Sequence, residues 1–239
     1  MKRGYKDVSV TAREEGYGVT LDAAPLRTPL GKELLVPSSH LAEAIAAEWR
    51  AQEGTVDKDG MKTTQLACIA LDLAHEKRDL VIKEILEYAA TDLVCYRAGH
   101  EPELAGQQEE ILAPIVAWAE TFLSIRLQLT GGIMPVAQPP ENDSAIDAYC
   151  SRLNVWELAL LAFVTKPLGS AILGIAFLEK QCGAADGFTL SHLEETFETK
   201  KWGEDGEKAA KLRATLSDLA AAEAFRSLLK NEISHGTKH

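Results

Sequence analysis

The chain has 239 residues, of which 46% are hydrophobic and 26% are charged, the ordinary balance of a protein that folds around an apolar core. Asp and Glu outnumber Lys and Arg by 36 to 25, which gives a formal net charge of -11 at pH 7. Because nucleic acids and anionic membrane surfaces are bound chiefly by clustered positive charge, this balance argues against both as partners.

The first 37 residues have the pattern of short strands. Three stretches with partial apolar and polar alternation are separated by turn-forming residues, and they cover residues 8–12, 17–21 and 33–36. This spacing predicts a small antiparallel meander.

After Pro37 the apolar residues recur at helical spacing. Ser38 and Ser39 are candidate N-caps for a helix that includes Leu41 and Trp49. Further helices are predicted over residues 61–75, 78–90, 103–123, 143–153, 155–165, 168–182, 189–200 and 205–230. We therefore predict an α+β protein, in which a β-rich domain at 1–37 precedes a larger all-helical domain at 38–239.

Two short interruptions of the helical pattern have the composition of extended chain. They are "DLVCYR" at 92–97 and "IRLQLT" at 125–130, and the β-rich domain could recruit either of them. Another irregular stretch, "TGGIMPVAQPPEN" at 130–142, combines glycines and prolines that cannot lie inside one helix. We interpret it as a structural junction, with contact to a partner as the alternative.

The most apolar block, 155–178, is interrupted by charged residues, a proline and a glycine, and it predicts buried helices, not a membrane span. A break is expected near Lys166 and Pro167. The side chains expected to be buried are Leu158, Leu161, Ala162, Ile172, Ile175 and Phe177.

The cysteines and the N-terminus favour a reducing compartment. Four cysteines, at 68, 95, 150 and 182, are too widely spaced for a CxxC pair and are expected to be reduced. The opening residues "MKRGYKDVSV" contain no apolar stretch of a secretory signal. A reducing compartment fits both observations.

Local catalytic motifs are absent from the sequence. It contains no GxxxxGK or GxGxxG phosphate loop, no HExxH metal motif and no GxSxG nucleophile elbow. Catalytic groups can still converge from distant positions, so an enzyme with scattered carboxylates stays open as an alternative, as does a non-catalytic scaffold of another complex.

The acidic tract "EETFETKKWGEDGEKAAK" at 194–211 has a tryptophan at its centre. Trp202 is followed by the helix-stopping Gly203 and by Asp205, a candidate N-cap for the next helix. One interpretation, favoured on composition alone, is a solvated helix–turn–helix with a core tryptophan. The other is an interface anchor surrounded by a charged rim.

Four stretches of the chain together resemble a known family, the assembly chaperones of the F1 part of ATP synthase that bind the alpha subunit. These stretches are "PLRTPLGKELLVPSSHLAEAIAAEW" at 25–49, "YAATDLVCYRA" at 88–98, "GGIMPVAQPP" at 131–140 and "LEETFETKKWGED" at 193–205. The family occurs in mitochondria and alphaproteobacteria, and since no leader is recognised in this sequence, we expect a bacterial member that acts in the cytoplasm.

The resemblance implies a small β-rich domain followed by helices, no enzymatic activity and no cofactor. It implies binding of the unassembled alpha subunit of F1-ATPase, which would keep that subunit from aggregating before assembly. We expect the chain to act as a monomer. In the family an acidic position near the KWG turn matters for function, which points here to one of the acids Glu194, Glu195, Glu204, Asp205 and Glu207. Together with Trp202 and Gly203 of the turn, these are the expected partner-binding residues.

Overall fold

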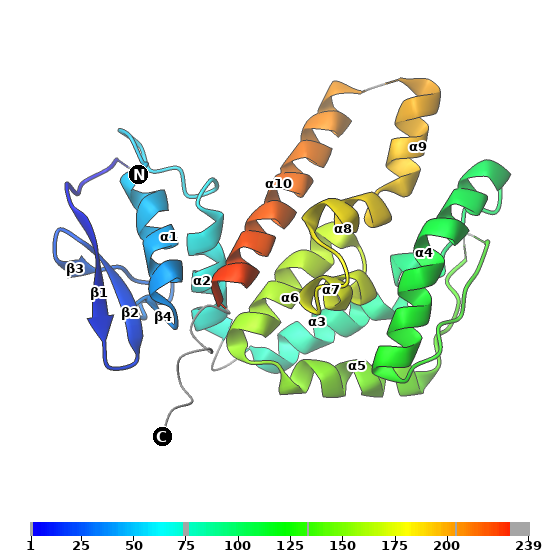
Figure 1. Cartoon of the computed structure of the whole chain (residues 1–239), viewed down its shortest axis with the longest axis horizontal. Coiled ribbons are helices and arrows are strands. Elements are labelled where there is room, and N and C mark those ends of the chain that lie inside the picture. The colour runs from blue at the N-terminus through cyan, green and yellow to red at the C-terminus, as the bar shows by residue number, and fades with distance from the viewer. Residues whose placement is uncertain (1, 74–76, 133, 204, 230–239) are drawn as a thin grey trace. The chain divides into compact units, whose positions relative to one another are not determined.

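The computed structural model of the chain describes residues 2–73, 77–132, 134–203 and 205–229 (Figure 1). These residues form two compact units. The first takes its described residues from Met1–Lys77, Val155–Leu160 and Ala221–His239, and the second from Arg78–Asn154 and Leu161–Ala220. A small N-terminal sheet followed by helices confirms the expected α+β class.

The sheet of the first unit is an antiparallel arrangement centred on one strand. Its strands are β1 (Val8–Arg13), β2 (Gly16–Leu21), β3 (Ala24–Pro25) and β4 (Leu35–Val36). β2 pairs with all three others, and its register with β1 runs from Val8 opposite Leu21 to Arg13 opposite Gly16. The three predicted stretches all contain strands, and β3 is an additional short strand after the turn at residues 22 and 23.

Two helices belong to the same unit as the sheet. α1 (Ser39–Arg50) begins at the predicted N-cap Ser38, whose hydroxyl oxygen accepts a hydrogen bond from the Leu41 N–H at 3.3 Å. α1 contacts β1, β2 and β4 as well as α2 (Lys62–Leu73). Residue 37 thus marks the change from strands to helices along the chain. In the folded protein, α1 and α2 nevertheless belong to the same unit as the sheet.

Helices make up most of the second unit. The elements are α3 (Arg78–Ala90), the 3₁₀ helix η1 (Leu93–Cys95), α4 (Pro102–Leu123), α5 (Pro140–Arg152), α6 (Val155–Leu168), α7 (Ala171–Leu178), α8 (Ala184–Ser191), α9 (Leu193–Trp202) and α10 (Gly206–Leu229). α3 packs against α5 and α7, and α4 packs against α5, α7 and α9. α6 and α10 each contribute residues to both units.

The apolar block forms two buried helices, as predicted, with the break later than expected. Pro167 lies in the last turn of α6, the helix ends at Leu168, and Ser170 caps α7. A proline removes one intrahelical donor, and so close to the end of a helix this loss is small. Of the side chains expected to be buried, five are, and Ala162 is half-buried.

The helix predicted over 168–182 is wrong in extent. α7 covers only 171–178, because Lys180 has a left-handed backbone (φ 63°), and α8 follows as a separate helix. Every residue of α7 is buried, so the segment lacks an apolar pattern on one side only. Such a pattern is what allows the ends of a helix to be predicted from the sequence.

Residues 92–97 are not a strand, and the sheet does not recruit them. Leu93–Cys95 is a 3₁₀ helix, and Tyr96 forms an isolated parallel bridge with Thr130. The second predicted interruption, 125–130, is non-helical but pairs mainly with side chains. The amide of Asn142 bonds both backbone groups of Arg126, at 3.2 and 2.9 Å, and the amide of Gln138 does the same for Gln128, at 3.0 Å each.

The glycine and proline stretch at 130–142 leads from the bridge at Thr130 to α5. Gly99 and Gly131 bring their backbones so close that a β-carbon on Gly99 would run into the carbonyl oxygen of Gly131. Pro140 is the first residue of α5, where the missing N–H of proline has no intrahelical partner to lose. Both features suit a junction with a fixed path.

None of the helices in the described ranges is both long enough and apolar enough to cross a membrane.

The contact between α6 and α7 depends on the absence of a side chain at Gly174. A β-carbon there would lie 2.6 Å from Thr165 Oγ1 and 3.0 Å from Leu161 Cδ1, both in α6. Gly174→Ala should therefore destabilise the protein by about 1–3 kcal/mol, measured by urea unfolding. Gly106→Ala in α4, where a β-carbon meets nothing within 4 Å, is the matched control and should stabilise by about 0.5–1 kcal/mol. Equal effects at the two positions would contradict close packing at Gly174.

Candidate functional site

The acidic tract forms a helical hairpin in the second unit. α9 ends at Gly203, whose positive φ of 94° favours glycine and whose N–H donates to the Thr199 carbonyl at 3.0 Å. Asp205 caps the start of α10, because its Oδ1 accepts from the N–H groups of Glu207 at 2.8 Å and Lys208 at 3.2 Å. Glu204 lies outside the described residues. Local hydrogen bonds thus close both ends of the turn.

Trp202 stands at this turn with 78% of its surface exposed. The interpretation as a core tryptophan is therefore wrong. α9 has no buried residue among those the structure describes, which explains the error: helical spacing places Trp202 on a face that no described residue buries. An exposed large aromatic side chain next to carboxylates has the composition of an interface anchor.

The predicted partner-binding residues fall into two groups. Trp202, Gly203, Asp205 and Glu207 lie at the turn, whereas Glu194 and Glu195 lie in the first turn of α9. At 1.5 Å per residue, the two groups are roughly 10–13 Å apart along the helix axis. The structure therefore does not gather the acids into one cluster, and it separates those next to Trp202 from those at the base of α9.

Ion pairs hold α9 on both sides. Lys201 donates to Glu101 at 2.5 Å, and Lys208 of α10 donates to Glu198 at 2.6 Å. The hydrogen bond from Lys208 to Glu198 raises the pKa of the lysine. Water and salt screen exposed pairs of this kind, so they hold α9 more weakly than a buried apolar face would.

One hollow of the second unit, about 680 Å³, is lined by residues of α3, α6, α9 and α10 and by His192. Phe163 and Leu212 contribute apolar walls. Of the predicted site residues, Glu195 lies in its lining.

A second hollow, about 260 Å³, joins two of the stretches that carried the family resemblance. Tyr96 comes from the stretch at 88–98, and Glu194 and Glu195 come from the stretch at 193–205, about a hundred residues later in the chain. Leu112 and Leu190 line the same hollow. Sequence reasoning missed Tyr96, and its place in the stretch at 88–98 was the available signal.

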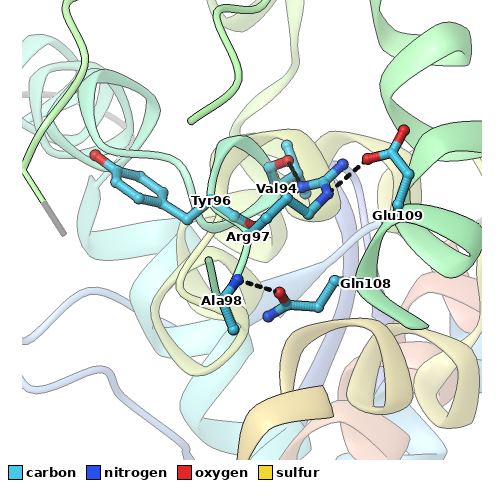
Figure 2. Close-up of polar contacts among 6 residues, drawn as sticks. All are labelled: Val94, Tyr96, Arg97, Ala98, Gln108 and Glu109. Atoms are coloured by element: carbon cyan, nitrogen blue, oxygen red, sulfur yellow. Dashed lines mark hydrogen bonds and ion pairs between the residues drawn. The ribbon is translucent and has the colours of Figure 1, made fainter. Parts of the chain in front are cut away.

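Arg97 is a structural residue of this region (Figure 2). Its guanidinium donates to the carbonyl oxygens of Val94 at 2.8 Å and Tyr96 at 3.0 Å, and to Glu109 at 2.9 Å. Its side chain is only 9% exposed, so these bonds lie in the interior of the second unit and not at its surface. As Figure 2 shows, the Gln108 amide accepts from the N–H of Ala98 at 2.6 Å, which fixes the chain after η1 to α4.

Asp92 is fully buried and links η1 to α7. Its carboxylate accepts from the Ser170 hydroxyl at 2.5 Å, the Ile172 N–H at 3.0 Å and the Val94 N–H at 3.2 Å. Burial raises the pKa of Asp92 to about 6, although the hydrogen bonds from Ser170, Ile172 and Val94 act in the opposite direction. Asp92 therefore has a structural role within the stretch 88–98, and its burial keeps it from contact with a partner.

Potential metal ligands were compared over the described part of the chain. Among the described residues, no group of three or more His, Cys, Asp or Glu side chains could hold a metal ion.

Comparison with known proteins decides the family. Residues 2–120 match the family model described as ATP12 chaperone protein. A crystal structure of Atp12 from Paracoccus denitrificans is 33% identical and superposes with a TM-score of 0.88, over 96% of this chain and 98% of that one. The chain belongs to the ATP12 chaperone family. The resemblance drawn from the four stretches is thereby confirmed.

Other relatives of the ATP12 chaperone family agree with this assignment. A putative chaperone from Agrobacterium tumefaciens, Atu1473, is 36% identical with a TM-score of 0.87, over 96% of this chain and 86% of that one. The mitochondrial protein atp12 of Schizosaccharomyces pombe is 26% identical over 214 aligned residues, and the match covers 84% of this chain and 74% of that protein. The matched family model ends at residue 120, before the hairpin, whereas the solved structures cover nearly the whole chain.

The raised pKa of Asp92 predicts a stability that depends on pH. The folded protein holds this proton more tightly than the unfolded chain, whose Asp has a pKa of 3.8. The stabilising contribution is therefore complete below about pH 4 and is lost as the pH rises through about 6. Relative to Asp92→Asn, the wild-type protein should lose on the order of 3 kcal/mol between those limits, measured by urea unfolding at several pH values.

Ser170→Ala is the control for Asp92. It removes one donor and keeps the carboxyl group, so the protein should be destabilised while the dependence on pH remains. A wild-type protein that gains stability over Asp92→Asn as the pH rises would mean that the donors outweigh burial.

Proposed function

We propose that the protein is an assembly chaperone of F1-ATPase that binds the unassembled alpha subunit and keeps it from aggregating. Membership of the ATP12 chaperone family supports the chaperone function. The observation that carries the choice of surface is the exposure of Trp202 at the tip of a hairpin, with Asp205 and Glu207 beside it. Neither catalysis nor a cofactor is required for this function.

The hairpin has the physical properties that a transient hold on a subunit requires. One large aromatic anchor supplies apolar contact area, and carboxylates around it speed encounter with a basic surface without adding much to the lifetime of the complex. A surface with a single anchor can be displaced when the next subunit arrives, in contrast to the wide apolar interface of a permanent complex.

The thiols are compatible with a reducing compartment. All four cysteines are free, and three of them are buried. Burial raises the pKa of Cys95 and of Cys150 to about 12, which suppresses the reactive thiolate. A location in the cytoplasm is part of the proposal, and the free thiols support it.

Wild-type protein should suppress aggregation of the alpha subunit without ATP. When denatured F1 alpha subunit is diluted into buffer, light scattering should fall with added protein and reach a plateau near equimolar ratio, because one client binds one chaperone. The two proteins should also elute together in gel filtration. Unchanged scattering together with separate elution would rule out this function.

Substitutions at the hairpin test the proposed surface. Trp202→Ala should weaken alpha-subunit binding by at least about 2 kcal/mol, the range of interface anchors, and leave thermal stability almost unchanged because the side chain is exposed. Leu80→Ala, which removes another exposed apolar side chain of the second unit, is the matched control and should bind normally. Binding is measured by biolayer interferometry with captured alpha subunit.

The charge at Asp205 can be separated from its capping role. Asp205→Asn keeps the cap, since Asn and Asp are equivalent at that position, and removes the carboxylate. It should slow association by a few-fold, with an effect that disappears in high salt. Normal association of Asp205→Asn would remove this acid from the surface while leaving Trp202 in place.

A further inference from the structure

Helix α9 lines two hollows of the second unit and is buried in neither. The hollow of about 260 Å³ is formed by α9 with η1, α4 and α8, and the hollow of about 680 Å³ by α9 with α3, α6 and α10. Glu195 of α9 lies in the lining of both. Among the described residues of α9, none is buried. A helix placed in this way has few close contacts to lose when it moves.

The length of α9 makes it dependent on such contacts. It has ten residues, and isolated helices shorter than about 12–15 residues are marginal in water because their nucleation is costly. Its apolar side chains are Leu193 and Phe197, which are half-buried, and Trp202, which is exposed. α9 is therefore expected to be less stable than the fully buried α7, and to leave its place more readily.

Both ends of α9 interrupt the helical path. His192, between α8 and α9, has φ -120° and ψ 31°, and Gly203 has a positive φ of 94°. His192 itself is fixed, since it is buried, its Nδ1 lies 2.8 Å from the Ser191 hydroxyl oxygen, and its ring stacks on Phe188. Positions at the ends of elements, where the backbone already departs from the helix, are those that act as hinges.

An ion pair joins α9 to α4. The Lys201 ammonium lies 2.5 Å from a carboxylate oxygen of Glu101, which is 100 positions earlier in the chain. Glu101 precedes the first turn of α4, and its side chain caps no N–H group there. The two side chains are 42% and 30% exposed, so dissolved salt reaches the pair and weakens it.

Two further contacts define what this ion pair controls. The Lys201 ammonium also lies over the ring of Trp202, 5.7 Å from its centre, so the pair bears on the exposed aromatic side chain of the proposed site. A separate ion pair, from Lys208 to Glu198, joins α9 to α10. Movement of α9 away from α4 therefore breaks the pair with Glu101 and leaves the pair with Lys208 in place.

An apolar surface lies under α9, in the hollow that α9 shares with α4. Leu93, Leu112 and Leu190 line this hollow. Leu112 is 1% exposed and Leu190 is 8% exposed. When α9 moves away from α4, these side chains lose part of their cover and become an apolar surface of the same hairpin region that carries Trp202.

We propose that α9 is a hinged lid on this hollow, and that the ion pair between Lys201 and Glu101 holds the lid closed. Breakage of the pair lets α9 leave α4, uncovers Leu112 and Leu190, and removes Lys201 from the ring of Trp202. The open form then offers Trp202 and the uncovered leucines to an apolar segment of the client, a step that rests on the chaperone function proposed above. The closed form keeps the same leucines away from water when no client is bound.

Amide hydrogen exchange of the full chain, followed by mass spectrometry, measures the opening of α9. Between about 10 mM and about 1 M NaCl the screening length falls from about 30 Å to about 3 Å, so exchange in α9 should become several-fold faster. Exchange in the buried α7 should be the same at both salt concentrations. Lys201→Gln should exchange rapidly in α9 already at low salt, and should lose most of the dependence on salt.

The neighbouring lysine supplies a matched control. Lys200→Gln removes the same charge from the adjacent exposed position of α9, and its exchange should equal that of the wild type. The double variant Glu101→Lys with Lys201→Glu re-forms the pair with its charges exchanged, so at low salt it should exchange more slowly than Lys201→Gln.

A thiol placed in the hollow reports on the apolar surface. Alkylation of Leu190→Cys by N-ethylmaleimide should become several-fold faster when Lys201→Gln is added, because the lid then opens more often. The half-buried Cys68 of the first unit is the internal reference and should react at the same rate in both variants. If Leu190→Cys fails to fold, the exchange measurements still decide the proposal.

Binding to captured alpha subunit tests the link to the client. When only the open form binds, an interaction that favours the closed form lowers the apparent affinity. Lys201→Gln should therefore bind the alpha subunit a few-fold more tightly than the wild type, which is the opposite of the effect expected for Trp202→Ala. Lys200→Gln should bind as the wild type does.

The lid would be overturned by equal exchange of α9 in low and high salt, by equal exchange in Lys201→Gln and Lys200→Gln, or by a charge-exchanged variant that is no slower than Lys201→Gln. Weaker or unchanged binding of the alpha subunit by Lys201→Gln would overturn the role of the open form. Failure of the chaperone function looks different: no variant binds the alpha subunit, although exchange in α9 still responds to Lys201→Gln.

Discussion

The hydrogen bonds of one buried carboxylate, Asp92, determine how the second unit is assembled. Asp92 caps η1 through the Val94 N–H and at the same time accepts from Ser170 and Ile172, which begin α7. Two segments 78 residues apart therefore share one acceptor. Because α7 is buried along its whole length, the position of its first turn decides where the surrounding helices can pack. Exchange of Asp92 for an apolar residue would leave several buried donors without partners.

Arg97 extends this arrangement toward α4. Its guanidinium bonds the carbonyls at the end of η1 and the carboxylate of Glu109, while Gln108 accepts the N–H of Ala98. The stretch at 88–98 therefore owes most of its polar residues to the stability of the fold. Tyr96 is the exception, since it is partly exposed in the hollow that also contains Glu194.

The contrast between α7 and α9 separates the scaffold from the surface proposed for binding. α7 has only buried residues, and α9 has none among those described. α9 is positioned by one ion pair to Glu101, by a second to Lys208 and by the turn at Gly203, and no described residue buries Trp202. Substitutions on that face can change binding with little effect on folding, whereas those along α7 change both.

The sequence by itself determined the α+β class, the existence of most helices, the cap at Ser38 and the three main strands. These follow from local chemistry: period, turn formers and capping residues act over a few positions. The sequence also carried the family resemblance, through stretches such as "TDLVCYRA" and "KWGED".

Only the tertiary structure decided the exposure of Trp202, the burial of Arg97 and the 3₁₀ turn at 93–95. The amides that pair with 125–130 come from side chains as distant in the sequence as Asn142. Tyr96 and Glu194 line the same hollow although they are about a hundred positions apart. Such features depend on which surfaces come together over long distances in the chain, and no local pattern encodes which face of a helix another element covers.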